Sequence, residues 1–286
     1  MKLIKPSVDY WPQEPGMNGI WRQVARATRV CYQSVPWTNR ETDEEFVKRV
    51  VLKQGLTSGG LDDLSNCVFD FNKVHGATLE HGTVYLKVPR TEPRVDDIED
   101  FYASNPFSFY YGKPLSDGNN YITTNMRCIL ESRRWDDLKY LCEPTEYHEK
   151  RYTFSIITDI GVTREMNRHR TFSICEQSTR YCDFTKDKFS GELTFVKPSW
   201  LNTQKDRECF YHACMIAEAD YKELRAAGWK PEEARQVLSL ALKTQAVYTA
   251  YEHDWVHFLA LRAHNVSGKA HPNIVQVAKM IEERME

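Results

Sequence analysis

The order of strand-like and helix-like segments is the feature that most restricts the fold of this chain. Apolar residues alternate with polar ones at 83–88 and 151–159, a pattern typical of half-buried strands. Helical spacing follows the capping box at 42–45 and also dominates 203–227. These segments do not form regular βαβ units, and no glycine-rich phosphate loop joins a strand to a helix. The sequence therefore predicts an α+β fold, with an antiparallel or mixed sheet flanked by helices.

The remaining segments complete one domain that spans 1–286 and carries a long insertion after its first core strand. The insertion covers approximately 90–148, because charged residues and then Pro, Gly, Asn and Ser dominate its first part. Helical spacing returns within it at 121–142. The other expected elements are a strand at 192–198 and helices that begin near Thr163, Pro231, Glu252 and Pro272.

Composition indicates an ordinary globular chain without a strong charge. Of 286 residues, 38 are Lys or Arg and 40 are Asp or Glu, so the formal net charge is −2. This balance gives no global field for nucleic acid or an anionic membrane, and any anion site must be local. The start of the chain lacks a signal-like apolar run, and no stretch approaches transmembrane length. We expect a soluble, cytoplasmic protein with no nucleic-acid or membrane partner.

Cysteine and histidine do not follow metal-binding or disulfide patterns. The 8 cysteines include no C-x-x-C pair, and the 9 histidines include no H-E-x-x-H motif. The sequence therefore predicts reduced, mostly buried thiols and no metal site. Cys175 is expected to be a packing residue.

The segment 164–181, REMNRHRTFSICEQSTRY, concentrates arginine in a nearly neutral chain. Guanidinium groups bind phosphate and imide oxygens in pairs of hydrogen bonds, and Ser178 with nearby backbone N–H groups would complete an anion cradle. On a helix, the side chains of Arg168, His169 and Arg170 would fan across roughly 200° and serve ligands on two sides. This segment is the strongest candidate for the functional site.

A second interpretation of the same segment needs no ligand. The arginines would then belong to a solvated helix end and form ion pairs with Glu165 and Glu176. Composition alone does not exclude this alternative.

The order of the motifs resembles that of flavin-dependent thymidylate synthases. Arg168-His169-Arg170, seven further residues and Ser178 match the family signature (168–178), and Thr179-Arg180-Tyr181 continues it. Three other segments occur in the family's order, at 75–86, 232–238 and 255–263. The resemblance spans roughly 70–275, with the insertion outside the family's minimal core.

The resemblance implies a reaction, its cofactors and an assembly. The family binds FAD and dUMP and transfers a one-carbon unit from 5,10-methylenetetrahydrofolate to C5 of dUMP, which gives dTMP. Reduced FAD is the hydride donor, and NADPH reduces it. The implied assembly is a homotetramer with active sites between subunits.

The resemblance also implies roles for individual residues of this chain. Arg262 is assigned the catalytic stabilisation of negative charge on the pyrimidine, and Ser178 a hydrogen-bonding part in the reaction. The implied cofactor contacts are His75, Arg168, His169, Arg170, Glu176, His253 and His257. The implied substrate contacts are Glu165, Arg168, Glu176, Gln177, Ser178, Thr179, Arg180, Arg235 and Arg262.

Three alternative functions remain open at this point. A related enzyme would transfer a hydroxymethyl group to dUMP, and the sequence does not distinguish the two products. A nucleic-acid-binding protein would use 168–170 and the aromatic residues as a basic and stacking surface. A catalytically silent protein would keep the nucleotide but not the flavin, because Tyr251, His253 and His257 replace the asparagines and arginine usual in the family.

Overall fold

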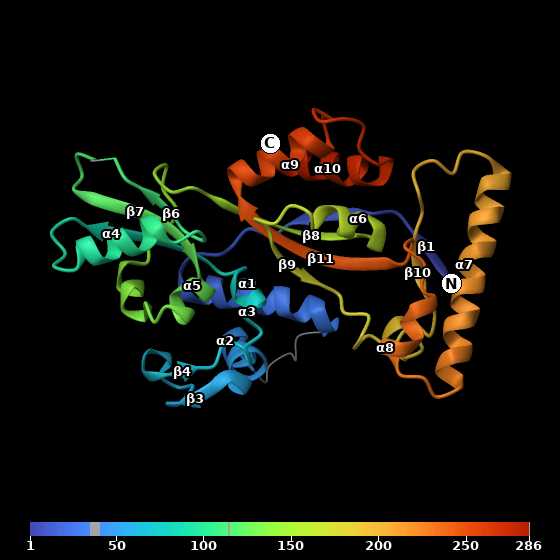
Figure 1. Cartoon of the computed structure of the whole chain (residues 1–286), viewed down its shortest axis with the longest axis horizontal. Coiled ribbons are helices and arrows are strands. Elements are labelled where there is room, and N and C mark those ends of the chain that lie inside the picture. The colour runs from blue at the N-terminus through green and yellow to red at the C-terminus, as the bar shows by residue number, and fades with distance from the viewer. Residues whose placement is uncertain (35–40, 114, 286) are drawn as a thin grey trace.

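The computed structural model describes residues 1–34, 41–113 and 115–285. Figure 1 shows an elongated molecule, with a central sheet between helices and a smaller sheet at one end. Strands and helices are mixed along the chain without βαβ order, which confirms the predicted α+β class. No helix in the described ranges is both long and apolar enough to cross a membrane.

The central sheet has the strand order β2-β8-β11-β9 and is antiparallel throughout. Its strands are β2 (Ser7–Tyr10), β8 (Arg151–Asp159), β9 (Ser173–Glu176) and β11 (Lys243–Tyr251). The predicted strand at 151–159 is therefore confirmed. Its whole length pairs with β11, from Lys243 opposite Asp159 to Tyr251 opposite Arg151.

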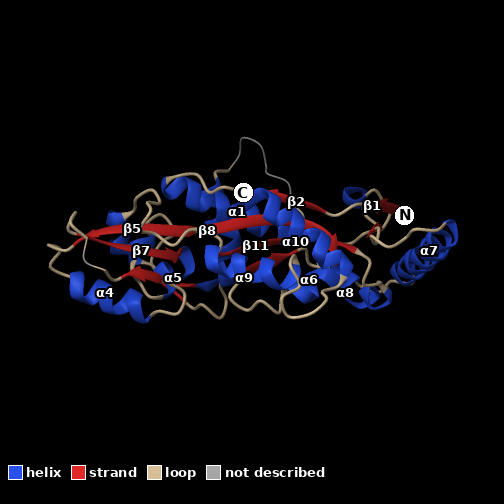
Figure 2. Cartoon of the chain, turned by 90° about the horizontal axis from the view of Figure 1, so that it is seen from above, coloured by secondary structure: helices blue, strands red, loops and turns tan. Residues whose placement is uncertain are grey.

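Helices cover both faces of this sheet. In Figure 1, α9 (Glu252–Arg262) and α10 (Pro272–Met285) lie on one face, and α1 (Gly16–Tyr32) lies on the other. Figure 2 shows the same layers from above. Trp255 of α9 is fully buried against Phe154 of β8, with ring centroids 5.0 Å apart, and anchors this side of the core. The helices expected from Glu252 and Pro272 are confirmed.

A three-stranded antiparallel sheet, β5-β7-β6, forms the end of the molecule that holds the predicted insertion. Strand β5 (Thr83–Pro89) confirms the prediction for 83–88 and pairs along its length with β7 (Asn119–Asn125). The helix predicted from residue 121 is therefore wrong for 121–125, which belong to β7. A helix begins only with α5 (Met126–Glu131). The reason is local, because Tyr, Ile and two Thr residues in succession favour a strand.

The remaining elements frame these two sheets. Helix α7 (Gln204–Ala226) confirms the long helix, with Thr203 as its cap. The helix expected from Pro231 is shorter than predicted, since α8 (Pro231–Ala234) gives way to a 3-10 turn at Arg235–Val237. The other elements are β1 (Lys2–Ile4), α2 (Asp43–Val47), β3 (Leu56–Ser58), β4 (Val68–Phe69), α3 (Gly76–Leu79), α4 (Val95–Ser104), β6 (Phe109–Tyr111), α6 (Ile160–Met166) and β10 (Thr194–Val196).

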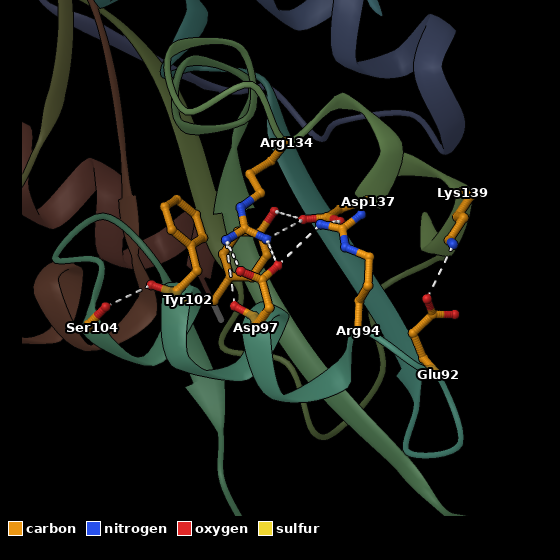
Figure 3. Close-up of polar contacts among 9 residues, drawn as sticks. Glu92, Arg94, Asp97, Tyr102, Ser104, Arg134, Asp137 and Lys139 are labelled. Atoms are coloured by element: carbon orange, nitrogen blue, oxygen red, sulfur yellow. Dashed lines mark hydrogen bonds and ion pairs between the residues drawn. The ribbon is translucent and has the colours of Figure 1, made fainter.

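Ion pairs hold α4 against the 3-10 turn at Trp135–Tyr140 (Figure 3). Asp137 is fully buried, and its Oδ2 accepts a hydrogen bond from the Tyr102 hydroxyl at 3.2 Å. Arg94 and Arg134 lie 3.6 and 3.8 Å from this carboxylate and also contact Asp97. Burial raises the pKa of Asp137, because its charged form is poorly solvated.

We predict that Asp137→Ala lowers the free energy of unfolding by about 2 kcal/mol, because it leaves the buried Tyr102 hydroxyl without an acceptor. Asp137→Asn keeps an acceptor oxygen and should lose less than half as much. Urea denaturation followed by circular dichroism measures both changes. The control is Asp136→Ala at the exposed neighbouring position, which should stay within about 0.5 kcal/mol of the wild type. Equal effects of Asp137→Ala and Asp136→Ala would contradict this account of the contact.

Candidate active site

The segment 164–181 leaves the central sheet through α6 and returns to it as β9. Helix α6 begins at Ile160, because the Asp159 side chain caps it by accepting the Val162 N–H at 2.9 Å. The helix ends at Met166, so the expectation that it continues through Arg168, His169 and Arg170 is wrong. Arg168 and Arg170 lie in turns, and His169 between them has no regular structure. A fan set by helical periodicity therefore does not describe these three side chains.

A cavity of about 670 Å³ opens between α6, the loop after β9 and the 3-10 turn after α8. Its volume falls in the range of small-molecule sites. Six of the predicted substrate residues line it: Glu176, Gln177, Ser178, Thr179, Arg180 and Arg235. The fold thus brings together residues that are up to 59 positions apart in sequence.

Two threonine hydroxyls hold the carboxylate of Glu176 at the rim of this cavity. Thr163 of α6 and Thr244 of β11 both donate to Glu176 Oε1, at 2.8 and 3.0 Å. Thr244 is buried, with 2% of its surface exposed. These two hydrogen bonds fix the direction of the carboxylate.

We predict that Thr244→Val weakens the binding of the ligand that Glu176 contacts by about tenfold. The reason is that a hydrogen bond to a charged group contributes on the order of 1.5 kcal/mol or more. Titration of FAD and of dUMP, each followed by fluorescence or calorimetry, identifies which ligand is affected. Thr158 is the matched control, since it pairs with Thr244 across β8 and β11 but its buried hydroxyl has no hydrogen-bond partner among the described residues. Thr158→Val should leave both affinities unchanged, and a loss equal to that of Thr244→Val would count against the role of Glu176.

Backbone contacts shape the loop that follows β9. The N–H of Ser178 donates to the carbonyl of Cys31 at the end of α1, at 2.9 Å. The Ser178 hydroxyl accepts the N–H of Arg180 at 3.2 Å, as in a tight turn. Arg235 reaches the loop from the other side and donates to the Thr179 hydroxyl at 3.0 Å. The guanidinium groups of Arg180 and Arg235 therefore line the cavity near its serine and threonine hydroxyls, and Arg164 of α6 lines it as well.

A second polar cluster joins the end of α9 to the turn after α6. Nε of Arg262 donates to Nε2 of His169 at 3.4 Å, and Arg262 Nη1 lies 3.7 Å from the Glu165 carboxylate. The rings of His257 and His169 are 6.3 Å apart. Burial, and then the charge of Arg262, lower the pKa of His169 to about 4. His169 is therefore neutral near pH 7 and accepts a hydrogen bond from Arg262.

The remaining predicted residues lie outside these two groups. His75 precedes α3 and is exposed beside Tyr32, with ring centroids 6.5 Å apart. His253 stacks on Tyr251 and lies 2.9 Å from Glu149, at the end of the predicted insertion. Arg168 and Arg170 are exposed, and neither forms a salt bridge within the described residues.

Sequence reasoning missed several residues that position the site. Thr163, Thr244 and the carbonyl of Cys31 were not expected, because only the folded chain brings them to 176–178. Lys243 was missed as well, although its ammonium group donates to Gln177 Oε1 at 2.8 Å. A hydroxyl or amine within a strand carries no signal of its own in a single sequence.

The Cys175 side chain inside the signature fits the predicted packing role. It is buried beside Val30 and Val247, with 3% of its surface exposed. Its contact with the Cys31 thiol, together with burial, raises the pKa of Cys175 well above the usual value. A thiol in this environment is a poor nucleophile at neutral pH.

Comparison with known proteins finds similarity over the C-terminal half of the chain. The family model described as "Thymidylate synthase complementing protein" matches residues 145–286. A flavin-dependent thymidylate synthase of Pyrococcus furiosus is 36% identical over 137 residues, which are 46% of this chain and 53% of that protein. One from Thermotoga neapolitana is 31% identical over 134 residues, or 46% of this chain and 62% of that protein. The chain spans about half the length of the curated relatives it matches.

Two crystal structures of the UMP/dUMP methylase PolB from Streptomyces cacaoi are also similar in part. The complex with 5-Br dUMP is 24% identical and covers 47% of this chain and 65% of that chain, with a TM-score of 0.40. The complex with 5-Br UMP is 15% identical and covers 100% of this chain and 91% of that chain, with a TM-score of 0.46. The family model and the sequence relatives agree: residues 145–286 of this chain are similar to the family described as thymidylate synthase complementing protein, and the curated relatives they match are flavin-dependent thymidylate synthases.

Proposed function

We propose that the protein is a flavin-dependent thymidylate synthase, which converts dUMP into dTMP with 5,10-methylenetetrahydrofolate as the one-carbon donor. The observation that carries the proposal is the cavity, which gathers Arg180, Arg235, Ser178 and Glu176 around a space of small-molecule size. In this proposal NADPH is the reductant. FAD, when bound, supplies the hydride that completes the methyl group.

The residues around the turn after α6 fit an anionic cofactor such as FAD. Arg168 and Arg170 are exposed and have no carboxylate partner in the described part of the chain. Such guanidinium groups suit the diphosphate of a dinucleotide. His169 is neutral and stacks on Phe172, with ring centroids 5.6 Å apart, so it offers a flat surface rather than a competing charge. We assign the flavin contacts to this turn, with His75, Glu176, His253 and His257 as further proposed contacts.

The cavity residues suit the two ends of dUMP. Arg235 and Arg180 would bind its phosphate, because guanidinium groups match phosphate oxygens with two hydrogen bonds. Ser178, Gln177 and Thr179 would supply hydrogen bonds to the rest of the nucleotide. Arg262 would face the pyrimidine ring and stabilise the negative charge that develops as C5 reacts. Glu165 holds Arg262 in place from α6.

The separation of the two polar groups supports active sites that lie between subunits. Arg262 and His169 do not line the cavity that contains Arg235 within the described residues of one chain. An active site that uses both groups is completed most simply by a second copy of the chain. We therefore propose a homotetramer as the active form. We place it in the cytoplasm, because all 8 cysteines are free thiols and disulfides are rare in that reducing compartment.

Product identification tests the proposed function. Purified protein would be incubated without oxygen with dUMP, 5,10-methylenetetrahydrofolate, FAD and NADPH, and the nucleotide would be analysed by mass spectrometry. We expect dTMP, and none when FAD is omitted. A hydroxymethylated nucleotide would replace the proposed synthase with a hydroxymethylase. Unchanged dUMP under all conditions, with bound nucleotide, would favour a silent binding protein.

A further inference from the structure

A second cavity has a volume of about 300 Å³ and shares Gln177 with the cavity around Arg235, the proposed nucleotide cavity. Three lysines from separate elements line it: Lys2 of β1, Lys188 of the 3-10 turn Asp187–Phe189, and Lys243 at the start of β11. Phe184 and Phe189 form its apolar side. The proposed reaction uses none of these residues.

The three ammonium groups have no carboxylate partner among the described residues. The carboxylate that lines this cavity, Glu192, already lies 3.1 Å from the amino group of Met1. Lys188 is held in place because it donates to the carbonyl of Tyr32 at 2.7 Å. The cavity therefore gathers positive charge that no acidic side chain in it balances.

Lys243 is the most constrained of the three lysines. Its ammonium group donates a hydrogen bond to Gln177 Oε1 at 2.8 Å. Among the described side chains, this neutral amide is the acceptor that contacts it. Burial lowers the pKa of Lys243 to about 8, because the charged amine is poorly solvated there. An anion in the cavity would offset this cost.

We propose that this cavity binds the phosphate group of a small phosphate monoester. Lysine ammonium groups act as point charges, which suit the tetrahedral oxygens of phosphate. A planar carboxylate would be matched better by the forked donors of arginine, and no arginine lines this cavity among the described residues. The size of the cavity is at the lower end of small-molecule sites, so the ligand is small.

Gln177 connects this phosphate site to the nucleotide cavity, because it lines both. A phosphate that contacts Lys243 competes with the Gln177 amide for the ammonium group. The amide then loses the contact that fixes it, at the point where the loop enters the nucleotide cavity. Occupancy of the two cavities is therefore coupled, and by linkage each ligand changes the affinity of the other by the same factor.

Titration of the full chain with inorganic phosphate, followed by calorimetry without flavin, folate or dUMP, tests the site. The starting protein carries Arg164→Ala, Arg180→Ala and Arg235→Ala, so that no arginine of the nucleotide cavity contributes to phosphate binding. We expect one phosphate site to remain in this protein. Adding Lys243→Met should weaken it by about tenfold or more, and adding Lys2→Met should weaken it several-fold. Adding Lys205→Met, at an exposed lysine of α7 that does not line the cavity, should change nothing.

If the Lys243→Met protein does not fold, the Lys2→Met protein still tests the site, because Lys2 is exposed and its substitution should not disturb the fold. Loss of all phosphate binding in the starting protein without these arginines would overturn the proposal, as would equal affinities for the Lys2→Met and Lys205→Met proteins. Ribose 5-phosphate and dTMP distinguish the sources of the phosphate. If dTMP binds more tightly than ribose 5-phosphate, its base contacts Phe184 and Phe189. If the two ligands bind equally, the cavity recognises the phosphate group. Because dUMP turnover is not measured, failure here leaves the proposed synthase function untouched.

Discussion

Arg262→Ala is expected to lower the rate of the proposed reaction by about 10²–10³, while FAD binding persists. The structure places Arg262 at the end of α9, between the Glu165 carboxylate and the neutral ring of His169. Its guanidinium group is thus oriented before substrate arrives and needs little rearrangement during the reaction. If it faces the pyrimidine as proposed, its interaction grows as negative charge develops at C5, so its loss affects the transition state more than the ground state.

Single-turnover kinetics at saturating dUMP and folate measure this effect. Arg262→Lys should restore little, because a compact ammonium group does not reproduce the planar fork held by Glu165 and His169. The control is Arg284→Ala in the last turn of α10, where the guanidinium contacts the Met280 carbonyl and the neighbouring Glu283 carboxylate, and it should react at the wild-type rate. A wild-type rate for Arg262→Ala, with only the dUMP dissociation constant raised, would show that Arg262 binds substrate without taking part in the chemistry.

Arg235→Ala is expected to raise the dUMP dissociation constant by about 10², because a charged hydrogen-bonding group opposite phosphate contributes roughly 1.5–3 kcal/mol. Arg235 is anchored at 3.0 Å to Thr179 and lines the cavity, so its guanidinium has a defined direction. The rate at saturating dUMP should change much less, since the phosphate is remote from C5. Equilibrium titration together with the turnover number separates the two effects.

Deoxyuridine provides the matched ligand for this prediction, because it lacks only the phosphate. Its affinity should be equally weak for the wild type and for Arg235→Ala. Thr179→Val removes the hydroxyl that anchors Arg235 but keeps the arginine. It should raise the dUMP dissociation constant by a smaller factor than Arg235→Ala does. An equal loss of affinity for dUMP and deoxyuridine in Arg235→Ala would place this arginine at the base or sugar instead of the phosphate.

The sequence predicted those elements whose residues have one clear pattern. Strands at 83–88 and 151–159 and the helix at 203–227 each have a regular alternation or a cap, and the structure has all three. Strand β11 was missed, although it lies at the centre of the main sheet. Most of its residues are buried on both faces, and they include Thr244 and Thr249, so polar and apolar residues do not alternate along it.

The sequence predicted residues of the candidate site, but it did not predict how their side chains are arranged in space. The cavity around Arg235 is lined by motifs that are separate in sequence, and their order was enough to name six of its lining residues. The turn at 168–170 was wrongly placed in a helix, because the Asp159 cap starts α6 before Thr163 and the helix ends at Met166. Contacts such as Lys243 with Gln177 depend on strand pairing and packing, which a single sequence does not specify.

In the proposed function, this chain couples flavin oxidation to methylation of dUMP. The most direct test of this coupling is a single-turnover experiment without oxygen, in which protein-bound FAD is first reduced with one equivalent of NADPH. Flavin absorbance and dTMP are then followed after mixing with dUMP, with 5,10-methylenetetrahydrofolate, or with both. We predict that the flavin is reoxidised only when both are present, and that one dTMP forms per flavin. Formation of dTMP without flavin oxidation, or no reoxidation with both substrates bound, would contradict the proposed function.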